Sequence, residues 1–101
     1  MRWIASGGCA TTDVAYPKEM LPVTQTENAF DCMSICLQTV GCGYINWCSP
    51  GISNCDNDCA LFSASLPITK GNDYPGHNCY AKNTYTGKNN GKLITFFWGY
   101  L

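Results

Sequence analysis

The apolar residues between positions 24 and 40 recur at spacings of three and four, the period of one face of an α-helix. Thr24 and Glu27 have the spacing of a capping box, in which each side chain satisfies a backbone N–H of the first helical turn. Gly41 follows at the position of a left-handed C-terminal cap. The sequence therefore predicts a helix from Thr24 to about Val40. Its apolar stripe consists of Ala29, Met33, Cys36, Leu37 and Val40.

Four other segments have the short length and the aromatic or branched residues typical of β-strands, and Gly, Pro, Asn and Asp separate them. Cys32 and Cys36 lie four residues apart, so they share one face of the helix, which must pack against the elements that carry their disulfide partners. We therefore expect an α+β fold, a small disulfide-rich domain with one α-helix packed on an antiparallel β-sheet. The predicted strands are Trp3–Ser6, Gly43–Cys48, Cys59–Ala64 and Asn78–Tyr85.

The C-terminal segment would be apolar on both faces if it formed a strand. One face would carry Ile94, Phe96, Trp98 and Tyr100, and the other Leu93, Thr95, Phe97 and Leu101. Such a strand needs burial on both sides and is an aggregation hazard when exposed. It could extend the sheet of its own domain, join a neighbouring subunit's sheet in an oligomer or fibre, or be foreign to the natural protein. We divide the chain into a domain of residues 1–86 and an appended strand or tail of residues 87–101, with Ile94, Phe96, Phe97, Trp98 and Tyr100 as the candidate assembly residues.

Size and cysteine content favour a disulfide-stapled domain. A chain of 101 residues forms about one domain, and a core of that size gives only marginal stability. The 8 cysteines are even in number and lack the paired C-x2-C spacing of zinc modules, which favours disulfides over zinc. Disulfides indicate a secreted or cell-surface protein. The first residues have no apolar run of signal-peptide length, so we expect the export signal to precede this numbering.

Charge excludes some partners. Six Lys and Arg residues against seven Asp and Glu residues give a formal net charge of -1, without a basic run, so nucleic acid is not an expected partner. The longest apolar run, residues 93–101, is far short of the ~20 residues that cross a bilayer, and we expect no membrane insertion.

We expect neither catalysis, nor a cofactor, nor a metal. The single histidine, His77, lies in a turn-rich loop, where a solvated side chain is favoured over a catalytic base. The segment Asn54–Asp58 lacks the glycine and the distal glutamate of an EF-hand loop, so an Asx-rich turn is favoured over a calcium site.

Four cysteine-containing segments follow one another in order. They are Phe30-Asp31-Cys32-Met33-Ser34-Ile35-Cys36, then Cys42, then Cys59-Ala60-Leu61-Phe62, then Cys79-Tyr80-Ala81-Lys82. This order resembles the PAN/apple family, in which a helix with two cysteines precedes a third cysteine, a strand with cysteine and leucine, and a closing cysteine. The resemblance covers about residues 3–86, and residues after Thr86 have no counterpart. A small disulfide-rich inhibitor or toxin is the alternative, although such chains are usually shorter and more basic.

The resemblance also implies a disulfide pairing, which spacing alone does not determine. It implies Cys9–Cys79, Cys32–Cys59 and Cys36–Cys42, and it leaves Cys48–Cys55 as a pair additional to the six-cysteine family core. Cys48 and Cys55 flank a loop, and cysteines at the two ends of a hairpin loop can be joined across it.

The resemblance further implies an extracellular adhesion module, because PAN/apple domains make protein contacts in coagulation zymogens and sugar or protein contacts in parasite adhesins and microbial lectins. The expected partner is an extracellular protein or glycan. A sugar site needs aromatic faces and a few fixed polar groups. Packing of the tyrosines and solvation of the charges is the plainer interpretation, and a subunit that assembles through residues 93–101 is the competing class. The candidate ligand-binding residues are Lys70, Asp73, Tyr74, His77, Tyr80 and Lys82.

Overall fold

The computed structural model describes residues 2–52, 54–89 and 92–98, and the side chains of residues 2–52 and 54–82. Within these residues it is a small, mostly β, disulfide-rich domain with one helix, α1 (Ala29–Gln38). The central antiparallel sheet has the strand order β1 (Arg2–Ser6), β7 (His77–Ala81), β4 (Cys42–Cys48), β5 (Asp58–Ser63) and β3 (Thr24–Gln25). Two smaller sheets pair β2 (Cys9–Ala10) with β6 (Lys70–Gly71), and β8 (Asn83–Asn89) with β9 (Lys92–Trp98). The expected combination of one helix with an antiparallel sheet is confirmed.

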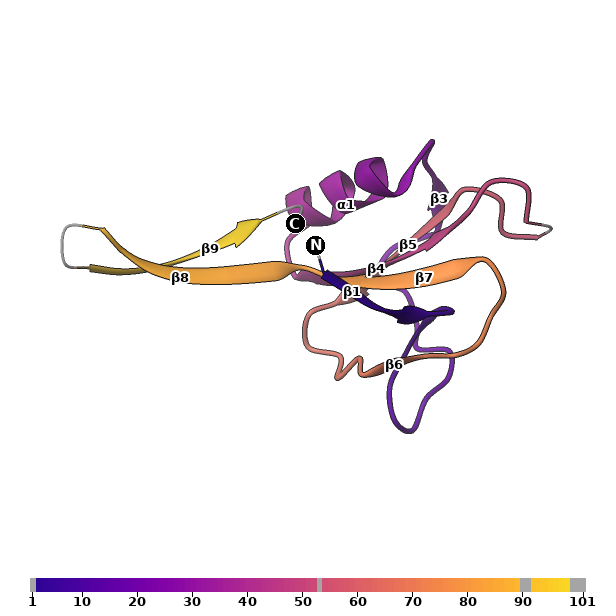
Figure 1. The fold of residues 1–101 in the computed structure, drawn as a ribbon, viewed down its shortest axis with the longest axis horizontal. Helices are drawn as coiled ribbons and strands as arrows, with labels where there is room; N and C mark the ends of the chain where they lie inside the picture. The colour runs from indigo at the N-terminus through magenta and orange to yellow at the C-terminus, as the bar shows by residue number, and fades with distance from the viewer. Residues whose placement is uncertain (1, 53, 90–91, 99–101) are drawn as a thin grey trace.

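The central sheet is buried on both faces along β4 and β5, whereas the outer strands β1 and β3 are largely exposed. The helix α1 covers one face and the β2–β6 sheet lies against the other (Figure 1). Successive residues of a strand point to opposite faces, so Leu61 packs with Met33 under the helix while Phe62 packs with Ile68 on the far side. Because both of its faces are buried, β5 is almost continuously apolar. No helix among the described residues is long and apolar enough to cross a membrane.

Three disulfides join these layers, and a fourth closes a loop after β4. Cys32–Cys59 ties α1 to β5, and Cys36–Cys42 ties the helix to the first residue of β4. Cys9–Cys79 connects β2 to β7 across a sequence separation of 70, and Cys48–Cys55 closes a separation of 7. Three of these are the pairs that the resemblance implied, and Cys48–Cys55 is the additional pair that it left.

The predicted capping box is wrong. The helix begins after Asn28, whose side chain accepts a hydrogen bond from the backbone N–H of Asp31 at 2.9 Å. Thr24 lies in β3, where it pairs with Cys59 of β5. Asparagine is an N-cap at least as good as threonine, and residues 24–25 gain sheet hydrogen bonds instead, so the helix starts one turn later than predicted.

The C-terminal end of the helix also differs from the prediction. The helix ends at Gln38, and Gly41 follows with φ 83°, in the left-handed region expected of it. Val40 therefore lies beyond the helix and is 96 % exposed, so it is not part of the buried stripe.

The last predicted strand is divided in two. β7 ends at Ala81 and β8 begins at Asn83, before the expected domain boundary at residue 86. β9 pairs with β8, from Asn83↔Trp98 to Asn89↔Lys92, and does not join the central sheet. The resulting hairpin projects from the body of the domain (Figure 1). Of the candidate assembly residues, Ile94, Phe96, Phe97 and Trp98 lie in β9, and Tyr100 lies outside the described residues.

Candidate functional site

The loop between β6 and β7 is held in one arrangement by the side chain of Asn72. Its Oδ1 atom accepts hydrogen bonds from the backbone N–H groups of Gly8 (2.7 Å) and Tyr74 (3.0 Å). Its Nδ2 atom donates to the carbonyl of Ala15 at 2.8 Å. Asp73 follows with φ 64°, a left-handed conformation that aspartate adopts more readily than most residues. The loop is therefore anchored to the N-terminal segment.

This loop, the end of β1 and the residue after β4 line an open pocket of about 350 Å³, which we call the loop pocket. The backbone N–H of Gly7 donates to the carbonyl of His77 at 2.7 Å, and that of Ser49 donates to the carbonyl of Gly76 at 3.1 Å. Gly7 has φ 88°, and a Cβ atom there would lie 2.6 Å from the Asp73 nitrogen, so this close approach requires glycine. The lining residues are Ser6, Gly7, Ser49 and residues 73–78.

Aromatic rings and polar side chains meet in the loop pocket. The rings of Tyr74 and His77 are in edge contact, with centroids 4.9 Å apart and planes at 86°. Tyr74 is 38 % exposed, so part of its ring is available to a ligand. Beside the pocket, Nε1 of the exposed Trp3 donates to Oδ1 of Asn78 at 3.2 Å. The pocket thus combines an accessible ring with hydroxyl, amide and carboxylate groups.

His77 is half-buried, which corrects the expectation of a solvated side chain. Burial lowers the pKa of His77 below its usual 6.5, and the negative charge of Asp58 opposes part of that shift. The Nδ1 atom is buried and has no hydrogen-bond partner. A ring nitrogen of His77 and the sulfur atoms of Cys48 and Cys55 lie within 4.8 Å of one another.

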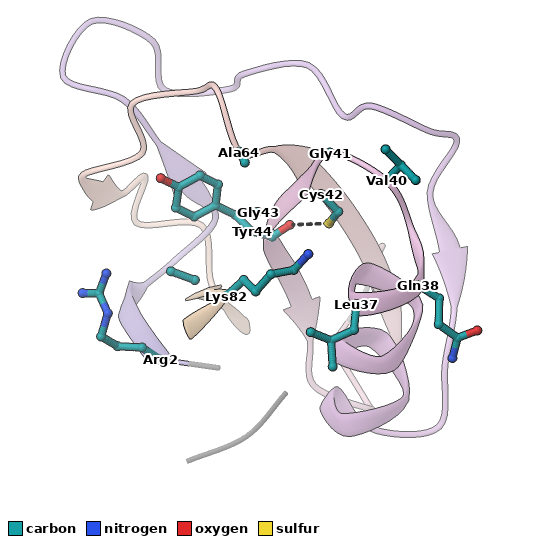
Figure 2. A pocket seen from close by; sticks show the side chains of 11 residues that line it. Arg2, Leu37, Gln38, Val40, Gly41, Cys42, Gly43, Tyr44, Ala64 and Lys82 are labelled. Atoms are coloured by element: carbon teal, nitrogen blue, oxygen red, sulfur yellow. Dashed lines mark hydrogen bonds between the residues drawn. The ribbon is translucent and has the colours of Figure 1, made fainter. Parts of the chain in front are cut away.

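A second cavity of about 480 Å³, the helix-end pocket, lies beside the C-terminal end of α1. In Figure 2 the side chain of Lys82 lies between those of Tyr44 and Leu37, and Arg2 lies on the side away from the helix. Burial lowers the pKa of Lys82. The lining residues are Arg2, Leu37, Gln38, residues 40–44, Ala64, Ala81 and Lys82.

The structure brings together only half of the residues predicted to bind a ligand. Asp73, Tyr74 and His77 line the loop pocket. Lys70 lies on β6 as an exposed residue that does not line that pocket, and Lys82 lines the helix-end pocket. Tyr80 is partly buried against the core under the helix, as the plainer packing interpretation expected. Strand alternation places Tyr80 on the helix side of β7 and its neighbour Cys79 on the opposite side.

The pocket residues that come from elsewhere in the chain, Ser6 and Ser49, were not predicted from the sequence. Ser6 ends β1 and Ser49 follows β4, and the pairings Ser6↔Asn78 and Cys48↔His77 bring both strand ends to the start of β7. These registers are set by pairing between strands that are distant in the sequence. No signal in the sequence near Ser6 or Ser49 indicates which residues of β7 they will lie beside.

Comparison with known protein-family models, with curated proteins and with solved structures gives no match for this chain.

Proposed function

We propose that the chain is a secreted or cell-surface, non-catalytic binding module that recognises a carbohydrate in the loop pocket. One observation carries this proposal. Three residues chosen from the sequence as sugar ligands, Asp73, Tyr74 and His77, meet in one cavity, and Ser49 and Asn78 add a hydroxyl and an amide.

The chemistry of the loop pocket suits a sugar. A sugar ring presents C–H groups that stack on an aromatic ring and hydroxyl groups that exchange hydrogen bonds with polar side chains. Tyr74 offers the ring, and Ser6, Ser49, Asp73 and Asn78 offer polar groups around it. Its volume of about 350 Å³ lies at the small end of the roughly 300–1,000 Å³ usual for ligand pockets, so we favour one or two sugar units over a long chain.

The disulfide framework supports the extracellular part of the proposal. Four disulfides in a domain of this size are typical of proteins exported to an oxidising compartment. Two of them start from α1, which packs on an antiparallel sheet. We propose on this basis that the frame is PAN/apple-like, with Cys48–Cys55 as an added staple.

A glycan array followed by calorimetry of the best ligand tests the carbohydrate site. We predict that Tyr74→Ala weakens binding about tenfold, because a stacked aromatic contributes roughly 0.5–1.5 kcal/mol beyond its buried area and 1.4 kcal/mol corresponds to tenfold. Phe30→Ala is the matched control, since Phe30 is an exposed aromatic residue on α1, outside the pocket.

Unchanged affinity in both Tyr74→Ala and Asn78→Ala would remove the loop pocket as the site. An array without any bound glycan would instead direct the search to a protein ligand.

A structural subunit that assembles through its C-terminal strand is the second candidate. The observation in its favour is that β9 lies in a two-stranded sheet of its own with β8, and an isolated two-stranded sheet is marginally stable in water. Pairing with a second copy would add strands to that hairpin. We predict that deletion of residues 83–101 converts an assembled protein to a monomer in analytical ultracentrifugation and leaves glycan binding unchanged. A full-length chain that is monomeric at high concentration would eliminate this candidate.

A further inference from the structure

The two sulfur atoms of the Cys48–Cys55 disulfide lie beside the imidazole of His77. Cys48 is the last residue of β4, His77 is the first residue of β7, and the two are register partners in the antiparallel sheet. Directly opposed residues place their side chains on the same face. Cys55 returns to Cys48 after a short loop, which brings one ring nitrogen and two sulfur atoms within 4.8 Å of one another.

The Nδ1 atom of His77 is buried without a hydrogen-bond partner. Buried polar side-chain atoms nearly always have a partner, and this atom is one of three exceptions among the described residues, with Nε1 of Trp47 and Oδ1 of Asn57. Sulfur atoms in a disulfide carry no proton, so they cannot donate to a ring nitrogen. A metal ion bound between these three side chains would bond the ring nitrogen that lies beside the sulfur atoms.

The geometry points to a Zn²⁺ site that is closed while Cys48 and Cys55 are joined and opens when their disulfide is reduced. The ligands would be the two thiolates and the imidazole of His77, with water in the fourth position. Thiolate sulfur and imidazole nitrogen are the donors that zinc prefers, at about 2.3 Å and 2.0–2.1 Å. Tetrahedral coordination at those lengths places the donor atoms about 3.5–3.8 Å apart, a small adjustment once the S–S bond is broken.

The chemistry of opening balances in two steps. A dithiol reductant transfers two electrons and two protons to the Cys48–Cys55 bond, which gives two thiols and leaves the reductant as a disulfide. Zinc binding then displaces both thiol protons to solvent. His77 contributes the lone pair of a neutral ring. Among the described residues no other three histidine, cysteine or acidic side chains meet in this way.

Selective opening of one disulfide provides the test. The full chain can be prepared by chemical synthesis with photolabile groups on Cys48 and Cys55, and then folded so that the other six cysteines form their three disulfides. Illumination releases the two thiols, and peptide mapping verifies that Cys9–Cys79, Cys32–Cys59 and Cys36–Cys42 remain closed. Co²⁺ serves as the probe, because tetrahedral thiolate coordination gives characteristic visible and near-ultraviolet bands.

We expect the dithiol protein to bind one Co²⁺, displaced by Zn²⁺, and the fully oxidised protein to bind none. His77→Ala should weaken Co²⁺ binding by more than the roughly 10–100-fold that is typical when a residue that only orients a metal ligand is lost. Asp13→Ala, a change at an exposed acidic residue outside the cluster and outside the loop pocket, should bind as the parent does. X-ray absorption of the zinc-loaded parent should show two sulfur ligands and one imidazole, which tests the site without any substitution.

Three results would overturn the inference. They are absence of the thiolate-to-cobalt band in the dithiol protein, equal metal binding by the oxidised protein, and a zinc spectrum without an imidazole.

Discussion

His77 has different surroundings on its two sides. Its ring is in edge contact with that of Tyr74 in the loop pocket, its Nδ1 atom is buried, and one of its ring nitrogens lies near the sulfur atoms of Cys48 and Cys55. Loss of hydration disfavours the protonated imidazole more than the Asp58 carboxylate favours it, which is why the pKa of His77 is lowered. The neutral ring is therefore the form that meets a ligand at neutral pH.

We predict that the imidazole of His77 in the oxidised protein titrates below pH 6.5, as NMR of its ring protons would measure. The unfolded chain then binds this proton more tightly than the folded one. Folding stability should consequently be unaffected by His77 above pH 6.5 and should fall as the pH drops from 6.5 through the folded-state pKa. The variant His77→Gln should lack that part of the pH dependence. A midpoint above 6.5 would contradict the burial of this ring.

At the scale of the element, the start of α1 depends on one side chain. Because Asn28 accepts a hydrogen bond from the Asp31 N–H, we predict that Asn28→Ala lowers the free energy of unfolding by about 1 kcal/mol. Glu27→Ala is the control and should change it by less than about 0.5 kcal/mol, since Glu27 is exposed and lies before the cap. Urea denaturation measures both values. Equal losses of unfolding free energy in the two variants would favour a capping box of Thr24 and Glu27 over the Asn28 cap.

Local sequence patterns predicted most of the strands but not which strand each of them pairs with. The strands β1, β4 and β5 lie within one or two residues of the predicted segments, because their aromatic and branched content is a local property. The break at Lys82 was not predictable in this way. It occurs where β7 reaches the end of its pairing with β1 and β4, and long-range pairing of that kind leaves no mark in the sequence of residues 78–85.

At the scale of the whole molecule, the disulfides differ in how strongly they restrict the unfolded chain. Loop-closure entropy predicts about 4 kcal/mol for Cys9–Cys79, with its separation of 70, and about 2 kcal/mol for Cys48–Cys55, with its separation of 7. We predict that replacing the first pair by alanines lowers the free energy of unfolding by about 2 kcal/mol more than replacing the second. Urea denaturation of the two double variants measures the difference, and a larger loss for the short loop would contradict the entropic origin.

The loop pocket shows where inference from sequence ends. Asp73, Tyr74 and His77 are close in the chain, so their grouping was predictable from local composition. Ser6 and Ser49 join them only because β1 and β4 flank β7 on its two sides. Lys82 follows the last residue of β7, at the end of the strand opposite the loop pocket, and it lines the helix-end pocket instead. Nearness in the sequence does not separate these two positions.

The position of Cys9–Cys79 has a mechanical consequence for a domain that holds on to a partner. Arg2 pairs with Ala81, so tension applied at residues 2 and 82 would peel β1 from β7 one pair at a time. Peeling stops at the covalent bond between Cys9 and Cys79. Only the residues outside that bond, 2–8 and 80–82, can straighten, which limits the extension to roughly 35 Å at about 3.5 Å per residue. Load would then pass through the disulfide, and the helix and the remaining strands would stay folded beneath it.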